Sequence, residues 1–272
     1  MPFRMPTRAR RALPRLLWQV LLLLGLHAAL PACAAPDGAA QDALRAGAQL
    51  RQQGQLALAI GRLRQAEALA TTEATRLRAG AELGAALLQA RQLAAAEAAL
   101  LPAYASLQGA ERARVALDLG NLAALYGSTG EAERFYDEAV RLAADDPQIS
   151  VAARLNRARL AGPDARLGAL GRLATDIARL PDGPAKARWQ INLGQQAGGI
   201  GDSGLALAHA QLDAARRWAL AARGDAARDR LGAEALDALA QLYEERGRPG
   251  DAQRLNTQAL ALIERPGLQI AT

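Results

Sequence analysis

The 272-residue chain has little of several residue types, and each shortage excludes a class of protein. It contains one cysteine and two histidines. A disulfide framework needs paired cysteines, and a structural zinc site needs several Cys or His ligands, so neither fits this sequence. Aromatic residues make up only 3% of it. So few rings leave little to stack on bases, which argues against nucleic-acid binding.

The positive charge is concentrated at one end. A net charge of +6 and a pI near 10.3 would suit a protein that binds phosphates. However, five arginines precede the first acidic residue, Asp37. They are Arg4, Arg8, Arg10, Arg11 and Arg15. Without these five, 28 of the 33 basic residues remain against 27 acidic ones, a net charge of +1, so the rest of the chain is nearly neutral.

Residues 1–34 have the three parts of a secretory signal peptide. An apolar stretch from Leu16 to Leu30 follows the arginines and ends in small residues. A membrane-spanning helix needs about 20 apolar residues, which is more than this stretch offers. We therefore expect residues 1–34 to direct export and residues 35–272 to form the mature domain in the periplasm. An uncleaved N-terminal membrane anchor is the alternative.

Two fates of Cys33 stay open. The sequence Leu30-Pro31-Ala32-Cys33 resembles a bacterial lipobox, which implies that the thiol carries lipid. Because Ala34 follows where Asp would signal inner-membrane retention, a lipoprotein would then be anchored in the outer membrane. Alternatively, cleavage after Ala34 removes the thiol and leaves a soluble periplasmic protein. Membrane contact is thus expected only through lipid on Cys33.

A repeat fills the remaining sequence, which is rich in Ala, Leu, Arg, Gln and Glu, all good helix formers. Pairs with a small second residue recur: Ala46-Gly47, Leu83-Gly84, Leu119-Gly120, Leu193-Gly194 and Leu239-Ala240. The residues seven positions later are Gly54, Arg91, Gly127, Gly201 and Gly247. Glycine at four of these five positions predicts a left-handed turn between two helices. Each unit is therefore a helix hairpin.

The spacing of the pairs predicts a further, degenerate unit. Successive pairs lie 37, 36, 74 and 46 residues apart. The distance of 74 is twice 37, and Leu155-Asn156 provides the missing pair, with Pro163 as its helix break. The distance of 46 predicts about two extra helical turns between Trp218 and Arg230. We also expect Pro102 to shorten or kink the helix that contains it.

These units resemble the tetratricopeptide repeat family. The best matches are Leu119-Gly120 through Ala132, Tyr136 and Ala139 to Pro147, and Leu239-Ala240 through Tyr243, Gly247, Ala252 and Ala259. The resemblance covers roughly residues 40–265. It implies an all-α fold: a right-handed α-solenoid of about six antiparallel helix hairpins, with a concave surface lined by the first helix of each unit.

The family register also implies a set of groove residues. They are Arg78, Arg114, Asn121, Arg157, Arg188, Asn192, Gln195, Asp237, Gln241 and Glu244. In family members that hold an extended peptide, Asn and basic residues at such positions bind its backbone and terminal carboxylate. Arginine suits a carboxylate because its planar fork forms two parallel hydrogen bonds. The alternative is that these arginines are ordinary exposed residues of an Arg-rich sequence.

Catalytic chemistry has no visible basis in the mature chain. His209 is its one histidine, and it falls inside a helical stretch from Leu205 to Leu212 with no nucleophile motif nearby. The Gly-rich stretch from Gly198 to Asp202 lacks the preceding strand and the lysine of a phosphate-binding loop. We expect no cofactor, no metal and no enzymatic activity.

The sequence therefore predicts a non-enzymatic scaffold or adaptor in the bacterial cell envelope. Its partner would be a protein or peptide held in the concave groove, without nucleic acid. The repeats are also weakly similar in style to tetratricopeptide regions linked to CHAT peptidase domains. The alternative is therefore a regulatory or substrate-recognition subunit for a separately encoded CHAT-type peptidase or a secretion system.

Overall fold

The computed structural model describes residues 37–143, 146–222 and 225–264. Residues 1–34, with the expected export signal and Cys33, lie outside this range. The described residues form twelve α-helices and one short 3₁₀ helix, with no strand among them. This confirms the all-α prediction.

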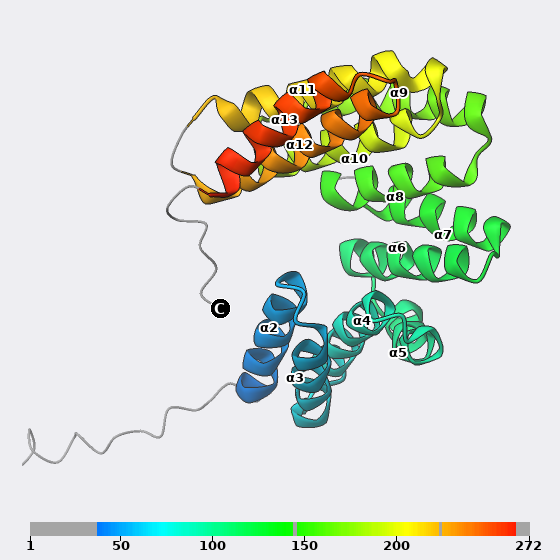
Figure 1. Cartoon of the computed structure of the whole chain (residues 1–272). Helices are drawn as coiled ribbons and strands as arrows, with labels where there is room; N and C mark the ends of the chain where they lie inside the picture. Colours follow the sequence, from blue (N-terminus) through cyan, green and yellow to red (C-terminus); the bar gives the residue numbers. More distant parts are fainter. Residues whose placement is uncertain (1–36, 144–145, 223–224, 265–272) are drawn as a thin grey trace, which may run out of the picture.

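The helices form six consecutive hairpins, which confirms the expected solenoid (Figure 1). The first helices are α2 (Gly38–Gln52), α4 (Glu73–Gln89), α6 (Gly109–Leu125), α8 (Pro147–Leu160), α10 (Pro184–Gly198) and α12 (Ala226–Glu244). The second helices are α3 (Leu56–Leu69), α5 (Leu93–Ser106), α7 (Thr129–Leu142), α9 (Pro163–Ala178), α11 (Leu205–Leu220) and α13 (Pro249–Ile263), with η1 (Asp202–Gly204) preceding α11.

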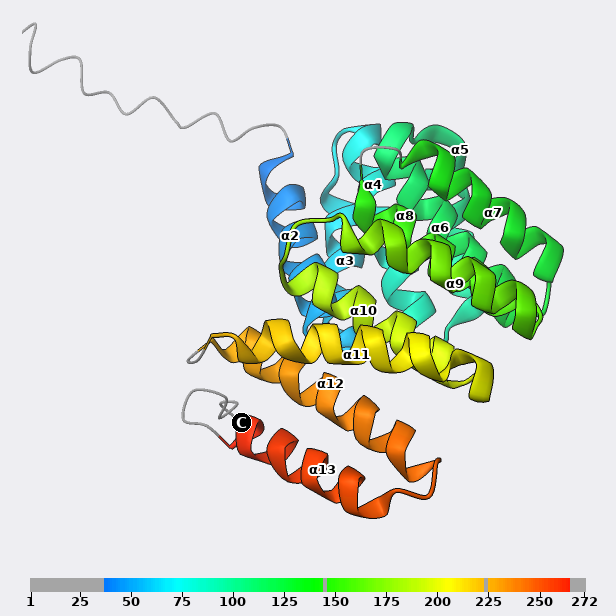
Figure 2. The ribbon, with the colours of Figure 1, turned by 90° about the horizontal axis from the view of Figure 1, so that it is seen from above.

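The first helices lie on the inner side of the curve. Each packs against the first helix of the next hairpin, whereas the second helices of neighbouring hairpins barely contact each other within the described residues. In a curved stack the elements on the short, inner side are the ones that meet. In Figure 2, α11, α12 and α13 lie in successive layers at one end of this stack. The concave face is therefore built from α2, α4, α6, α8, α10 and α12.

The turns within the hairpins follow the sequence pattern. All five residues seven positions after the repeated pairs have positive φ: 77° at Gly54, 60° at Arg91, 78° at Gly127, 93° at Gly201 and 69° at Gly247. Arg91 is the one non-glycine residue with positive φ in the described part of the chain. A side chain in this conformation is strained because its Cβ crowds the following carbonyl group.

Replacing Arg91 with glycine is expected to stabilise the protein by up to about 1 kcal/mol, because the strain at φ 60° disappears. Urea unfolding of Arg91→Gly and wild type measures this difference. Arg45→Gly, in the helical conformation of α2, is the matched control and is expected to destabilise by about 1 kcal/mol. A destabilised Arg91→Gly variant would contradict the prediction.

The glycines of the repeated pairs mark where the two helices of a hairpin touch. A Cβ built on Gly47, Gly84, Gly120 or Gly194 would lie 2.5–2.6 Å from a buried side chain of the second helix. The side chains in question are Leu63, Leu100, Tyr136 and Leu212. Ordinary carbon atoms do not approach so closely, so only glycine lets a large side chain pack directly on the helix backbone.

The fourth hairpin departs from this arrangement. Asn156 stands where the other pairs have glycine or alanine, and α8 and α9 make fewer contacts than the helices of any other hairpin. A partly buried amide is stabilised by hydrogen-bond partners. Asn156 finds one on the concave side, where its Nδ2 donates to Oδ1 of Asn121 at 2.7 Å. Residues 152, 156 and 159 of α8 therefore face inward.

Helix α8 is therefore rotated about its axis relative to the other first helices. The prediction that Arg157 lines the groove is wrong for this reason. One position along a helix is a turn of about 100°. With Asn156 facing the concave side, Arg157 points toward α7, where its Nη1 lies 2.5 Å from Oδ1 of Asp137. It lines none of the concave cavities described below.

Two expectations about helix length need correction. Helix α5 continues through Pro102 and has 14 residues, as α3 and α7 do, so the proline does not shorten it. Pro102 is exposed, as is Ala98, whose carbonyl group loses its partner and can be solvated. The extra length before the last hairpin is divided between α11 with 16 residues, the loop that follows it, and α12 with 19.

Candidate functional site

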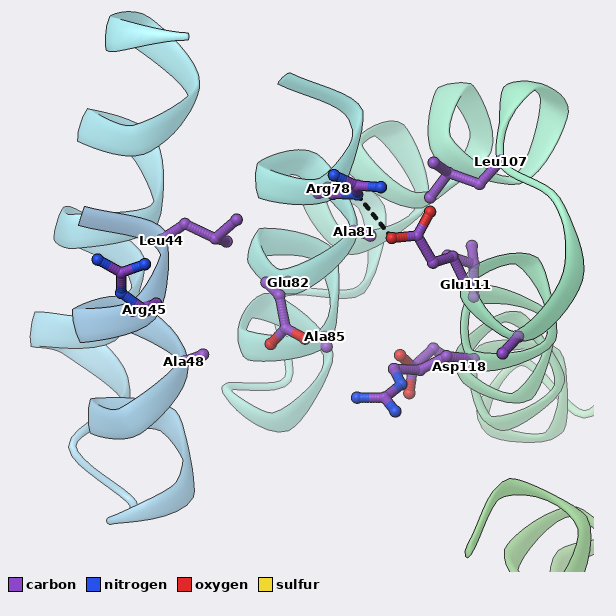
Figure 3. Close-up of a pocket in the computed structure, with 13 residues that line it drawn as sticks. Leu44, Arg45, Ala48, Arg78, Ala81, Glu82, Ala85, Leu107, Glu111 and Asp118 are labelled. Carbon is purple, nitrogen blue, oxygen red and sulfur yellow. Dashed lines mark hydrogen bonds and ion pairs between the residues drawn. The ribbon is translucent and has the colours of Figure 1, made fainter. Parts of the chain in front are cut away.

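Three neighbouring cavities form a continuous groove along the concave face. Cavity I, of about 370 Å³, lies between α2, α4 and α6 (Figure 3). Cavity II, of about 630 Å³, lies between α4, α6 and α8, and cavity III, of about 600 Å³, between α8 and α10. Ala85 and Asp118 line both I and II, while Asn156 and Arg159 line both II and III. Shared walls join the three cavities end to end.

The arginines around cavity I are paired with acids. Arg78 Nε donates to Glu111 Oε1 at 2.6 Å, as the dashed line in Figure 3 shows. Arg114 Nη2 lies 4.0 Å from Asp146 Oδ2. Leu44, Ala48 and the other apolar side chains fill most of the remaining wall. Cavity I therefore offers an apolar surface edged by charges that largely cancel.

Asp118 lies at the junction of cavities I and II. Burial, together with nearby Glu82, raises the pKa of Asp118 to about 7 against the opposing effect of Arg51 and Arg114. Arg51 is engaged elsewhere, because its Nη2 lies 2.8 Å from Glu82 Oε2. No cation of the described residues lies within ion-pair distance of Asp118. Its carboxyl group is therefore only partly ionised near neutral pH.

The raised pKa of Asp118 predicts a pH-dependent stability. The folded state holds this proton up to about pH 7 and the unfolded chain only to about 3.8, so wild type should lose stability as pH rises between these values. The shift corresponds to at most about 4 kcal/mol, and partial exposure of Asp118 reduces this to about 1–2 kcal/mol.

The measurement is urea unfolding of wild type and Asp118→Asn at pH 4.5, 6 and 8. Asparagine cannot ionise, so the variant should gain stability relative to wild type as pH rises and should be the more stable at pH 8. Asp42→Asn, at an exposed residue of α2, is the control. A difference between Asp118→Asn and wild type that stays constant with pH would refute the assignment.

Asn121 links three helices that line cavity II through hydrogen bonds. Its Oδ1 accepts hydrogen bonds from Tyr136 Oη at 3.0 Å and from Asn156 Nδ2 at 2.7 Å. Burial raises the pKa of Tyr136 to about 12, so the hydroxyl group stays protonated and donates. Asn121 thus joins α6 to α7 and α8.

Cavity III brings together basic and amide side chains. Arg188, Asn192 and Gln195 of α10 face Asn156 and Arg159 of α8 across it. Trp189 and Gln196 also line the wall. Among the residues that the structure describes, no carboxylate lies within 4 Å of the guanidinium of Arg159 or Arg188. Unlike cavity I, cavity III therefore carries positive charge without internal compensation.

The groove contains most of the residues expected from the repeat register. Arg78, Arg114, Asn121, Arg188, Asn192 and Gln195 line its three cavities. Gln241 does not line them: its Nε2 donates to Asp237 Oδ2 at 3.1 Å. Asp237 lines a fourth cavity of about 1060 Å³, which Gln53 and Gln55 of the first hairpin also border. The first and last hairpins therefore face each other.

The sequence interpretation missed Glu82, Asp118 and Arg159, although a signal for two of them exists. Glu82 and Asp118 stand two residues before the repeated Gly, at the position that Asn192 occupies in the fifth hairpin. This position lies four residues after the basic position of Arg78, Arg114 and Arg188, on the same helix face. Arg159 has no such signal because the rotation of α8 brings it into the groove.

Outside the groove, His209 lies on α11, where the repeat register placed it. Its Nε2 is 3.0 Å from Tyr243 Oη on α12, so it links two helices. The described residues contain no cluster of three or more His, Cys, Asp or Glu side chains that could hold a metal ion. Over the same residues, no helix is long and apolar enough to cross a membrane.

Comparison with known proteins supports the fold alone. No protein-family model matches the chain, and no curated protein matches its sequence. Among solved structures, the crystal structure of BtubC (BKLC) from P. vanneervenii is similar, with a TM-score of 0.53 over 87% of this chain and 95% of that one. The two sequences are 15% identical. The likeness is thus one of helical architecture.

Proposed function

We propose that the chain is an exported, non-enzymatic scaffold of tetratricopeptide type that binds an extended segment of a partner protein in its concave groove. The supporting observation is the groove itself: three cavities with shared walls follow five successive first helices, α2, α4, α6, α8 and α10. An extended segment fits a long, narrow surface of this kind, and repeat proteins commonly use their concave side for binding.

The chemistry of the groove walls also favours binding. Its polar groups include amides and arginines, which form hydrogen bonds with a peptide backbone and with carboxylates. The export signal expected in residues 1–34 places the partner in the bacterial cell envelope, and lipid on Cys33 would hold the protein at the outer membrane.

The proposal is tested by blocking the groove without changing its charge. Ala81→Phe combined with Ala152→Phe adds rings at partly exposed positions of cavities I and III. Ala95→Phe combined with Ala98→Phe adds the same rings to the exposed face of α5 and serves as the control. Circular dichroism would first establish that both variants keep their helices.

The measurement is recovery of envelope proteins with tagged wild type and each double variant. We expect the groove variant to lose specific partners at least about tenfold and the control to retain them. Identical partner sets from the two double variants would refute binding in the groove.

A further inference from the structure

Cavities II and III carry arginines that have no carboxylate partner among the described residues. Arg91 and Arg159 line cavity II, and Arg159 and Arg188 line cavity III. Within the described ranges of the chain, none of the three guanidinium groups has a carboxylate within 4 Å. By contrast, Arg78 and Arg114 in cavity I both have acidic neighbours. The Arg-rich composition does not account for this difference, because arginines line all three cavities.

The backbone of Arg91 is a second, independent observation. The equivalent turn position is glycine in four other hairpins, and Arg91 takes the same left-handed conformation with φ 60°. Glycine would adopt this conformation with less strain than arginine. Strained residues of this kind concentrate at functional sites, where the side chain is needed. Here the side chain lines cavity II.

We propose that cavities II and III bind an acidic, extended polypeptide segment, whose carboxylates pair with Arg91, Arg159 and Arg188. This inference rests on the proposed function and adds the chemistry of the occupant. Each arginine can hold a carboxylate through two parallel hydrogen bonds. Asn156, Asn192 and Gln195 stand beside these arginines and provide donors and acceptors for the backbone of the same segment.

The distribution of acids limits where the segment lies. Glu82 and Glu111 line cavity I, and Asp118 stands at its junction with cavity II. Like charges would repel an acidic segment there, whereas cavity III has no acidic residue in its wall. Charge complementarity therefore assigns the acidic segment to cavities II and III, away from the carboxylates of cavity I.

A polypeptide fits these walls better than a nucleic acid. Bases need aromatic side chains to stack on, and Trp189 is the one aromatic residue in the wall of cavity III. The repeated amides suit a backbone that offers alternating N–H and C=O groups.

The test uses three fluorescein-labelled decapeptides with blocked ends, alternating Glu–Ala, Gln–Ala and Lys–Ala, together with a labelled oligo-dT of twelve nucleotides. Binding to the mature chain is measured by fluorescence anisotropy. We expect the Glu–Ala peptide to bind more tightly than the other probes, and its affinity to fall as salt increases.

Matched variants locate the binding. Arg159→Gln combined with Arg188→Gln should weaken binding of the Glu–Ala peptide at least about tenfold, as expected for lost charge-assisted hydrogen bonds. Arg64→Gln combined with Arg141→Gln removes the same charge from exposed positions outside the groove and should change affinity less than about twofold. Arg91→Gly should weaken binding while its melting temperature stays equal or rises. If Arg91 had only a structural role, weaker binding would not occur together with an unchanged or higher melting temperature.

Equal loss of affinity in both double variants, or tighter binding of oligo-dT than of the Glu–Ala peptide, would overturn the inference. If only the Gln–Ala or Lys–Ala peptide binds, and Ala81→Phe/Ala152→Phe abolishes that binding, the groove function stands and the acidic occupant is refuted. If no peptide binds, the acidic occupant is likewise refuted, and recovery of envelope partners alone decides the groove function.

Discussion

Tyr136→Ala is expected to lower the free energy of unfolding by about 3–5 kcal/mol, the usual cost of removing a large buried aromatic side chain. Tyr136 is 2% exposed and is the largest of the fully buried side chains in the described residues. Its ring packs directly on Gly120, and its hydroxyl group donates to Asn121. Alanine would therefore leave a cavity between α6 and α7 and would remove one support of the groove floor. Chemical unfolding of residues 35–272 measures the loss.

Tyr136→Phe is the matched control. It keeps the ring and removes only the hydroxyl group, so we expect a loss of about 0.5–1.5 kcal/mol. Asn121 Oδ1 would still accept from Asn156 Nδ2. If Tyr136→Ala were no more destabilising than Tyr136→Phe, the ring would not support the third hairpin as described.

Gly84→Ala is expected to destabilise the protein by about 1–3 kcal/mol, although alanine is the better helix former. A Cβ at this position would lie 2.5 Å from Cγ of Leu100 and 3.3 Å from the carbonyl oxygen of Ala96. Leu100 is fully buried, so it has little space into which to move. Helices α4 and α5 would have to separate.

Gly61→Ala provides the control with the opposite sign. Gly61 lies inside α3, and a Cβ there would meet nothing within 4 Å. We expect this change to stabilise the protein by about 0.5–1 kcal/mol, because alanine loses less backbone entropy than glycine in a helix. The melting temperatures of Gly84→Ala and Gly61→Ala, each compared with that of wild type, measure the two effects. A stabilised Gly84→Ala variant would contradict the close approach of the helices.

Much of the fold could be predicted because it depends on local spacing. Small residues at a constant distance from a turn residue predict a hairpin wherever they occur, and all five turn positions found in this way have positive φ, including Arg91. The inward face of α4, α6 and α10 follows from the same spacing, since residues four and seven positions apart share a helix face. Six of the ten groove residues expected from the repeat register line the three cavities for this reason.

The remaining features depend on contacts between hairpins, which spacing does not reveal. Asn156 turns inward because Asn121, on the preceding hairpin, accepts its hydrogen bond. That contact moves Arg157 out of the groove and brings Arg159 into it. The raised pKa of Asp118 similarly results from burial and from the charge of Glu82 on α4, which outweigh the arginines on α2 and α6. Repeat periodicity does not predict such contacts between side chains of different hairpins.

The rotation of α8 also bears on how a ligand is aligned. An array of identical repeats presents the same surface at every step, so a long ligand can bind it in several positions displaced by one repeat. Here one helix in the middle of the array differs from its neighbours, and it places Arg159 between the two cavities that contain the other uncompensated arginines. A bound segment would therefore have a single preferred frame and a defined direction along the solenoid.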